Sequence, residues 1–240
     1  MSRAVLTTAI AALFFAVPVA HAQPPAPPAP IIPPPAEPAN IGDLKTDALR
    51  YYDSGSYLTN LHQAAAPAIA WINEQAPRVA RPALVLDVDE TSLSNWEAIK
   101  ANDFGRVIHG PCNELPAGPC GWATWDQRGS STVIPPTMDI YTAAKDRGAA
   151  VFFITGRPES QRAATERNLQ SVGYTGYTQL IMEPVGAHYV SAADFKAPQR
   201  GQIEQEGYTI IANVGDQPSD LAGGFSQQTY LLPNPFYRVP

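Results

Sequence analysis

Three short apolar runs, far apart in the sequence, each end in a cluster of polar residues, and this pattern limits the fold more than any other feature. The runs and the clusters that follow them are 83–86 with Asp87-Val88-Asp89-Glu90-Thr91, 150–154 with Thr155-Gly156-Arg157-Pro158, and 208–214 with Gly215-Asp216-Gln217-Pro218-Ser219-Asp220. Short apolar runs that end at turn-forming residues are typical of buried strands. We therefore predict strands with polar residues at their carboxyl ends.

Helical patterns separate these strands. Apolar spacing predicts a pair of helices within 40–72, further helices at 137–148, 158–172 and 196–207, and additional short strands at 180–182 and 229–232. Strands that alternate with helices are typical of a parallel sheet. The predicted fold class is α/β, with a Rossmann-like parallel sheet and helices on both of its faces.

The segment 92–136 interrupts this alternation. It holds both cysteines of the chain and three of its four tryptophans, Trp96, Trp122 and Trp125. An insertion after the first strand of such a sheet lies over the carboxyl ends of the strands, where ligands bind. We interpret 92–136 as a small cap insertion, and we expect Trp122 and Trp125 to pack in the cap core rather than to form ligand platforms.

The first residues resemble a targeting segment. Met1-Ser2-Arg3 precede an apolar run that ends in Ala20-His21-Ala22, the pattern of a signal peptide (1–22) cleaved after Ala22. A membrane-spanning helix is the alternative, and the short run that contains Pro18 disfavours it. No cysteine lies near the cleavage point to carry a lipid. The mature chain is expected to be exported, periplasmic or secreted, without a membrane anchor.

A linker is predicted next. Residues 23–39 contain nine prolines. Proline fixes φ and has no N–H to donate, so this stretch is expected to be an extended spacer, with a ligand for a proline-binding domain as the alternative. The folded domain is therefore predicted at 40–240.

The two cysteines lie in the predicted cap. Cys112 and Cys120 are separated by only seven residues. In an exported protein the favoured interpretation is a disulfide between them. A zinc site that also uses His109, for which no fourth ligand is evident, and a pair of free thiols are the alternatives.

Four carboxylates are expected to meet at one edge of the sheet. The carboxyl ends of parallel strands emerge on one side, so Asp87, Asp89, Asp216 and Asp220 should converge on one crevice. Like charges about 4 Å apart repel by about 4 kcal/mol at an effective dielectric near 20, so such a cluster holds either protons or a metal ion. Oxygen ligands favour a hard cation, Mg²⁺ before Ca²⁺ or Mn²⁺, and Mg²⁺ leaves positions open for a substrate phosphate.

Four residues are candidates to bind that phosphate: Thr155, Gly156, Arg157 and Lys196. Pro158 suits the first position of a helix, so the N–H groups that follow Thr155 are expected to face the crevice and to bind an anion. The Thr155 hydroxyl can donate to a phosphate oxygen, and Arg157 can make a bidentate contact. Lys196 is expected at the next crossover, where it adds a positive charge.

With these motifs in this order, the chain resembles a phosphatase of the haloacid dehalogenase (HAD) superfamily, and within it the class B acid phosphatases and the plant vegetative storage proteins. The resemblance covers roughly residue 40 to the C-terminus and implies the HAD fold. The segments that carry it are 85–95, 153–157, 213–221 and the tail Leu232-Pro233-Asn234-Pro235-Phe236-Tyr237.

The resemblance implies a mechanism. Asp87 would attack phosphorus and form an aspartyl-phosphate. Asp89 would protonate the leaving oxygen and later deprotonate the attacking water. Thr155 and Lys196 would hold the group in transfer.

The resemblance also implies the ligands of the cation. Mg²⁺ would bind an oxygen of Asp87, the backbone carbonyl of Asp89 and Asp216, while Asp220 would hold a metal-bound water. One departure concerns Lys196, because relatives often carry a more basic run there and only Arg200 represents it here.

The sequence thus predicts an exported, Mg²⁺-dependent acid phosphatase that hydrolyses small-molecule phosphate monoesters. The alternatives are a catalytically weak storage or binding protein on the same scaffold, and a phosphotransferase that passes the phosphoryl group to an alcohol. With 16 basic and 22 acidic residues the net charge is −6, which excludes a protein that coats nucleic acid.

Overall fold

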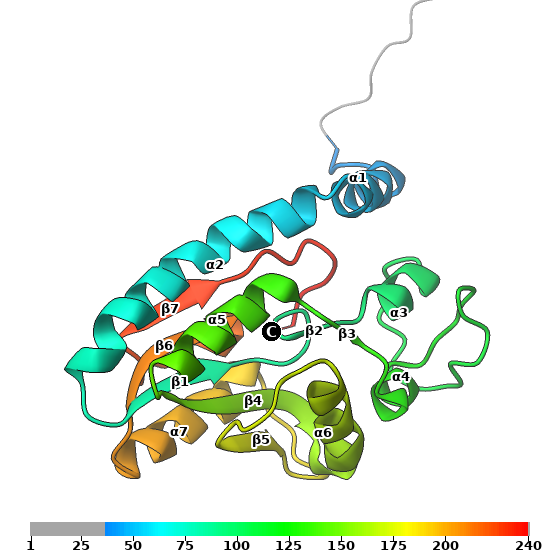
Figure 1. The fold of residues 1–240 in the computed structure, drawn as a ribbon. Helices are drawn as coiled ribbons and strands as arrows, with labels where there is room; N and C mark the ends of the chain where they lie inside the picture. The colour runs from blue at the N-terminus through cyan, green and yellow to red at the C-terminus, as the bar shows by residue number, and fades with distance from the viewer. Residues whose placement is uncertain (1–36, 240) are drawn as a thin grey trace, which may run out of the picture. The chain divides into compact units, whose positions relative to one another are not determined.

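Five parallel strands form the central sheet of this protein in a computed structural model that describes residues 37–239. The strands are β1 (Pro82–Leu86), β4 (Ala150–Pro158), β5 (Gln179–Glu183), β6 (Thr209–Gly215) and β7 (Gln228–Leu231), in the spatial order β5-β4-β1-β6-β7 (Figure 1). The strand that precedes Asp87, β1, is therefore the central one. The predicted signal peptide and nearly all of the proline-rich linker lie outside the described residues.

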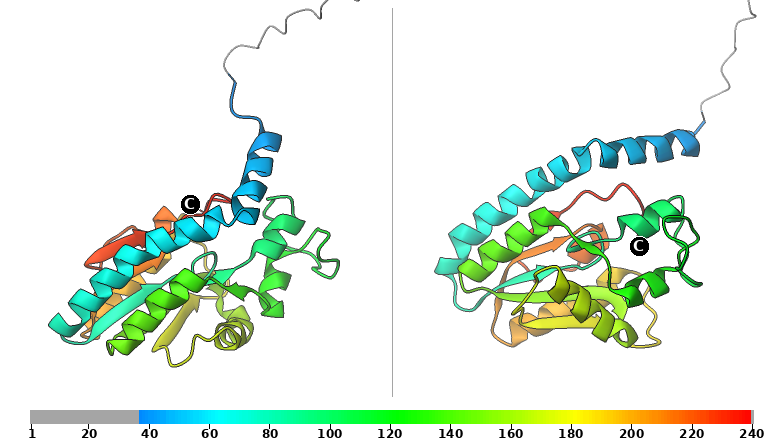
Figure 2. Two further views of the ribbon diagram at one scale, coloured as in Figure 1. Left: turned by 45° about the horizontal axis from the view of Figure 1, so that its top comes forward. Right: turned by 45° about the vertical axis from the view of Figure 1, so that its right-hand side comes forward.

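Helices cover both faces of the sheet. The helices are α1 (Ile41–Asp53), α2 (Ser56–Gln75), α3 (Trp96–Ala101), α4 (Trp122–Arg128), α5 (Pro135–Asp146), α6 (Arg162–Ser171), α7 (Ala192–Gln205) and α8 (Pro218–Leu221), with short 3₁₀ turns at Ala76–Arg78 and Glu159–Gln161. Helices α2 and α5 lie side by side over one face, and α7 lies on the other (Figures 1 and 2). This arrangement confirms the predicted α/β fold class.

The residues of β1 show how the two layers form. Side chains alternate across a strand, so Leu84 and Leu86 join the core beneath α2 and α5, while Ala83 and Val85 pack toward Phe195 of α7. These four residues of β1 are all buried. A strand covered on both faces must be apolar throughout, which explains the unbroken run in the sequence.

The first helix departs from this layered packing. Ile41 and Leu44 share the apolar stripe of α1, yet 70% and 53% of their surfaces are exposed. The helix is capped at its start by Asn40, whose side chain accepts from the N–H of Gly42. Within residues 37–239, no helix combines the length and the hydropathy that a membrane-spanning segment needs.

The segment between β1 and α5 forms a small irregular subdomain. It contains a two-stranded antiparallel sheet of β2 (Leu93–Ser94) and β3 (Thr132–Val133), together with α3 and α4. A disulfide joins Cys112 to Cys120, and both cysteines belong to one small buried cluster with Trp125. Figure 2 shows α3 and α4 at one end of the strands, on the side where β1 ends.

Two helix boundaries differ from the sequence prediction. Pro158 does not begin a helix: it ends β4 and pairs with Glu183 of β5 after a register shift that follows Thr155, and α6 starts only at Arg162. The N–H groups after Thr155 therefore belong to a strand end instead of a helix terminus. Pro198 lies inside α7, which already begins at Ala192 behind a capping box formed by Ser191 and Asp194.

Candidate active site

Asp87 is the first residue after the central strand. Its backbone N–H donates to the carbonyl of Val214 (3.0 Å), which continues the pairing of β1 with β6 by one residue. Its carbonyl accepts from the hydroxyl of Ser92 (2.6 Å), so the loop that follows folds tightly back. Burial raises the pKa of the Asp87 carboxyl well above its usual range, and the nearby Lys196 opposes that shift.

Asp216 follows the neighbouring strand β6. One carboxylate oxygen accepts from Thr91 (3.0 Å), and the other accepts from Gln217 (2.5 Å) and Asn234 (2.7 Å). These donors fix its orientation. Burial and the charge of Asp220 nevertheless raise the pKa of Asp216 to about 7.

Asp220 approaches from the first turn of α8. Its Oδ2 accepts from the N–H of Gln217 (2.9 Å), which forms the capping box of this short helix. A side chain at Gly215 could not be accommodated, because a Cβ there would lie 2.5 Å from the Cβ of Asp220. Glycine at the end of β6 thus allows Asp220 to reach the strand ends.

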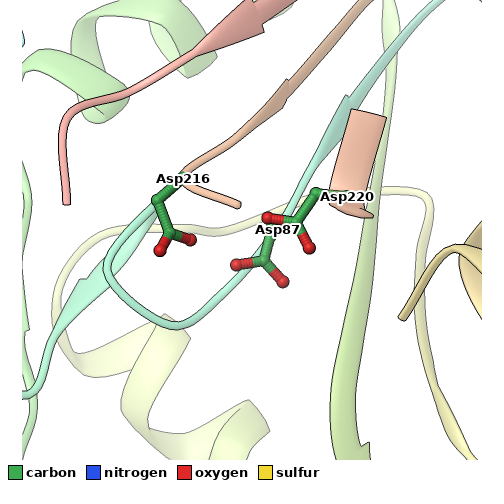
Figure 3. Close-up of side chains that lie close together, drawn as sticks. All are labelled: Asp87, Asp216 and Asp220. Carbon is green, nitrogen blue, oxygen red and sulfur yellow. The ribbon is translucent and has the colours of Figure 1, made fainter. Parts of the chain in front are cut away.

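The carboxylates of Asp87, Asp216 and Asp220 lie together, as Figure 3 shows. One oxygen from each lies within 4.8 Å of the others, and all three residues are buried. They come from the ends of two adjacent parallel strands and the turn beyond, which is where the sequence predicted a convergence. The strand-end pattern predicted that the Asp89 carboxylate would join them; it lines the same cleft but lies outside this group, and the ligand that the family resemblance implied there is its backbone carbonyl.

Lys196 supplies the positive charge beside this cluster. Its Nζ donates to Oδ1 of Asp87 (2.5 Å) and to Oδ1 of Asp220 (2.7 Å), and the side chain is almost fully buried. Burial would lower the pKa of Lys196, but Asp220 and Asp87 raise it above its ordinary value. The ammonium group therefore stays charged between two carboxylates.

The cluster fits a divalent cation. When ionised, the three carboxylates and the one ammonium group carry a net charge of −2 in a buried space, and a divalent ion would neutralise it. The donors are hard oxygen atoms, which Mg²⁺ and Ca²⁺ prefer. Asp87, Asp216 and Asp220 are the side chains that could hold such an ion.

Asp89 pairs with Arg157. Oδ1 of Asp89 accepts from Nη2 of Arg157 (2.6 Å), Nε donates to both carboxylate oxygens (3.2 and 3.1 Å), and Nδ2 of Asn95 donates to Oδ1 (2.8 Å). Burial would raise the pKa of Asp89, but the charge and hydrogen bonds of Arg157 and the bond from Asn95 lower it. Asp89 is thus held ionised in this arrangement.

The predicted phosphate-binding residues lie at different depths. Gly156, Arg157 and Lys196 line a cleft of about 490 Å³ above the carboxylates. Thr155 is fully buried beneath it, and its hydroxyl accepts from the N–H of Arg157 (3.1 Å), which leaves its own hydrogen free to donate. Arg157 already uses its bidentate edge on Asp89, so a direct contact with phosphate requires an exchange of partners.

Further residues at the site were not predicted from the sequence. The cap contributes Arg106, Ile108, His109, Trp122, Ala123 and Asp126 to the cleft wall, and Tyr237 closes it from the C-terminal tail. Arg106 lies over the rings of Trp122 (5.5 Å) and Tyr237 (5.8 Å). The sequence indicated this wall only through the predicted cap insertion at 92–136, without singling out these side chains.

Comparisons with known proteins agree with this geometry. Residues 36–240 match the model of a family described as HAD superfamily, subfamily IIIB (acid phosphatase). Acid phosphatase 1 of Solanum lycopersicum is 30% identical over 160 residues, which are 66% of this chain and 60% of that protein. Vegetative storage protein 1 of Arabidopsis thaliana is 29% identical over 157 residues, 65% of this chain and 55% of that protein. The chain thus spans less than two thirds of the length of these two relatives.

A solved structure shares the fold. The class C acid phosphatase from Bacillus anthracis superposes with a TM-score of 0.64 at 20% sequence identity, over 82% of this chain and 86% of that one. The resemblance inferred from the strand-end motifs is therefore confirmed by both sequence and fold. Because the family model spans most of the chain, this protein belongs to subfamily IIIB of the HAD superfamily, the acid phosphatase family.

Proposed function

We propose that this protein is an exported, Mg²⁺-dependent acid phosphatase that hydrolyses small-molecule phosphate monoesters through an aspartyl-phosphate on Asp87. One observation carries the proposal: the buried carboxylates of Asp87, Asp216 and Asp220 meet at the strand ends with Lys196 among them, at the base of an open cleft. Family membership supports the same activity.

In the first half of the reaction, an oxygen of Asp87 attacks phosphorus and the bond from phosphorus to the ester oxygen breaks. The departing oxygen takes a proton from Asp89. In the second half, Asp89 takes a proton from a water molecule, that water attacks phosphorus, and the bond to Asp87 breaks. Inorganic phosphate leaves, Asp87 is restored, and Asp89 is again protonated.

The environment of Asp89 suits the second half of the reaction, in which Asp89 takes a proton from water. An ionised carboxylate can accept a proton from water, and Arg157 and Asn95 keep Asp89 ionised and oriented. The first half needs the protonated form, which a low ambient pH and a looser pair with Arg157 would favour. This requirement is consistent with an enzyme that works in acid.

Positive charge is needed where a phosphate dianion approaches Asp87. Nζ of Lys196 donates a hydrogen bond to Asp87, and its positive charge lowers the repulsion between the Asp87 carboxylate and the incoming phosphate. Thr155 and Gly156 at the end of β4 and Arg157 beside Asp89 are the further groups proposed to bind the phosphate oxygens.

The cation proposed is Mg²⁺, which Asp87, Asp216 and the backbone carbonyl of Asp89 would hold, while Asp220 would act through a water molecule. When bound, it supplies positive charge that orients the phosphate and offsets the negative charge that builds up in the transition state. The all-oxygen donor set supports this choice of metal. Export is proposed from the signal-peptide pattern of residues 1–22.

Turnover of p-nitrophenyl phosphate by the chain from residue 23 onward tests the proposal. With Mg²⁺ it should release phosphate, EDTA should stop the release, and Asp87→Asn should abolish it. Asp139→Asn, on the exposed face of α5, is the matched control and should retain activity. No turnover of a broad panel of phosphate monoesters would favour the storage or binding alternative, and an ester product formed with an added alcohol would favour phosphotransfer.

A further inference from the structure

Two side chains hold Asp89, and each of them is itself held by the cap. Arg157 and Asn95 both donate to Oδ1 of Asp89. Trp125 contacts Asn95, and Asp126 contacts Arg157. Trp125 and Asp126 are consecutive residues of the cap helix α4. Successive residues of a helix point about 100° apart, so one turn of α4 can reach both supports of Asp89.

The Trp125 contact fixes the orientation of the Asn95 amide. Oδ1 of Asn95 accepts from Nε1 of Trp125 (2.8 Å) and from the hydroxyl of Ser131 (2.8 Å). An indole N–H can only donate, and an ionised carboxylate can only accept. With Trp125 on one side and Asp89 on the other, only one orientation of the amide satisfies both neighbours. The cap thereby turns Nδ2 of Asn95 toward its two acceptors, Oδ1 of Asp89 (2.8 Å) and Oε2 of Glu90 (3.1 Å).

The Asp126 contact bears on the guanidinium of Arg157. Oδ1 of Asp126 lies 3.2 Å from Nη2, the nitrogen that also donates to Asp89, and both side chains are at least 97% buried. Among the described residues, Oδ1 of Asp126 has no hydrogen-bond donor, so this ion pair is its main interaction. A second carboxyl group beside Nη2 restrains the guanidinium and, when ionised, competes with Asp89 for its charge.

We infer that Trp125 and Asp126 are positioning residues that place Asp89 for proton transfer to the leaving group. This inference rests on the proposed function, because it assigns the cap a part in that reaction. Neither residue needs to touch the substrate for this role: they act through Asn95 and Arg157. The cap helix is thus a support for the acid-base residue as well as a wall of the cleft.

The readout must separate positioning from a general loss of folded protein. Phenyl phosphate and p-nitrophenyl phosphate differ little in shape, but p-nitrophenolate leaves readily without a proton, whereas phenolate depends on one. The ratio of kcat/KM for phenyl phosphate to kcat/KM for p-nitrophenyl phosphate therefore reports proton transfer. The concentration of active enzyme cancels in this ratio, so partial unfolding does not change it.

Asp126→Asn keeps the shape of the side chain and removes its charge, and Trp125→Phe removes the indole N–H. Each should lower the ratio about tenfold, because misplacement of a reacting group by about 1 Å costs up to about 100-fold. Asp126→Glu, which restores the carboxylate, should recover part of the loss. Gln127→Ala, the next residue of α4 and exposed, is the matched control and should leave the ratio unchanged.

Asp89→Asn is the reference for loss of the proton donor and should lower the ratio at least as far. If Asp89→Asn lowers the ratio while Asp126→Asn and Trp125→Phe do not, the positioning role is rejected and the proposed function stands. If the unsubstituted chain hydrolyses neither ester, or Asp89→Asn leaves the ratio unchanged, the proposed mechanism fails and this inference fails with it.

Discussion

Nζ of Lys196 lies 2.5 Å from Oδ1 of Asp87, although the two residues are 109 positions apart in the sequence. The same nitrogen donates to Asp220, so one buried ammonium group joins the strand-end nucleophile to the turn after β6. In the absence of a cation, the ammonium group of Lys196 is the charge that balances the buried carboxylates of Asp87 and Asp220. The contact therefore has consequences for stability as well as for catalysis.

Lys196→Met should destabilise the metal-free protein by about 3–5 kcal/mol, because it leaves buried carboxylates without their partner. Urea denaturation in EDTA measures this loss. Added Mg²⁺ should recover part of it, since the ion would neutralise the same oxygens. Lys100→Met, at an exposed position of α3, is the control and should change the unfolding free energy little. If Lys196→Met lowered the unfolding free energy equally with and without Mg²⁺, the ion would not bind the carboxylates that Lys196 contacts.

Removal of the metal should itself be visible in stability. Mg²⁺ that binds only the folded chain stabilises it by about 2.7 kcal/mol at 100 times its Kd. Thermal unfolding at increasing Mg²⁺ should show a rising Tm, and EDTA should reverse it. Asp216→Asn should abolish the rise because it removes a ligand, whereas Asp139→Asn should preserve it. A rise that survives in Asp216→Asn would place the ion elsewhere.

The convergence of these groups could be predicted from the sequence for a topological reason. Asp87 and Asp216 each follow an apolar run, and parallel strands must place their carboxyl ends at one edge of the sheet. Lys196 could be predicted from its position in the next crossover. None of these placements depends on the details of side-chain packing.

The surroundings of Asp89 could not be predicted in the same way. Asn95 lies inside the first motif, but its partners Trp125 and Ser131 come from a cap without a regular hydrophobic period. Pro158 was expected to begin a helix, and pairing of β4 with β5 keeps it in a strand instead. In both cases the outcome is decided by contacts with segments distant in sequence.

Asp89→Asn should separate the two halves of the proposed reaction. With p-nitrophenyl phosphate the first half needs little help from an acid, but the second half still needs a base. Rapid mixing should show a burst of about one p-nitrophenolate per chain, followed by turnover about 10²–10⁴-fold slower than in the unsubstituted enzyme. Mass spectrometry should find one added phosphoryl group, and a second change, Asp87→Asn, should remove it. Full turnover in Asp89→Asn would remove Asp89 from its assigned role.

Glu90 should make the stability of the metal-free protein fall as pH rises. Burial and the charge of Asp89 raise the pKa of Glu90 from 4.5 to about 8, although hydrogen bonds from Tyr237 (2.5 Å) and the N–H of Asn95 (2.6 Å) oppose the shift. Between these two values the folded chain keeps a proton that the unfolded chain releases. The free energy of unfolding must then decrease with pH across this window.

Glu90→Gln cannot titrate, so the difference in unfolding free energy, variant minus unsubstituted, should rise from pH 4.5 and level off above pH 8. The rise should be on the order of a few kcal/mol, because each pKa unit corresponds to about 1.4 kcal/mol. Urea denaturation in EDTA across this range measures it, with the exposed Glu97→Gln on α3 as control. If the unfolding free energies of Glu90→Gln and the unsubstituted chain changed in parallel with pH, Glu90 would be ionised in the folded protein and this prediction would be wrong. The Tyr237 hydroxyl would then donate its hydrogen bond to a charged carboxylate.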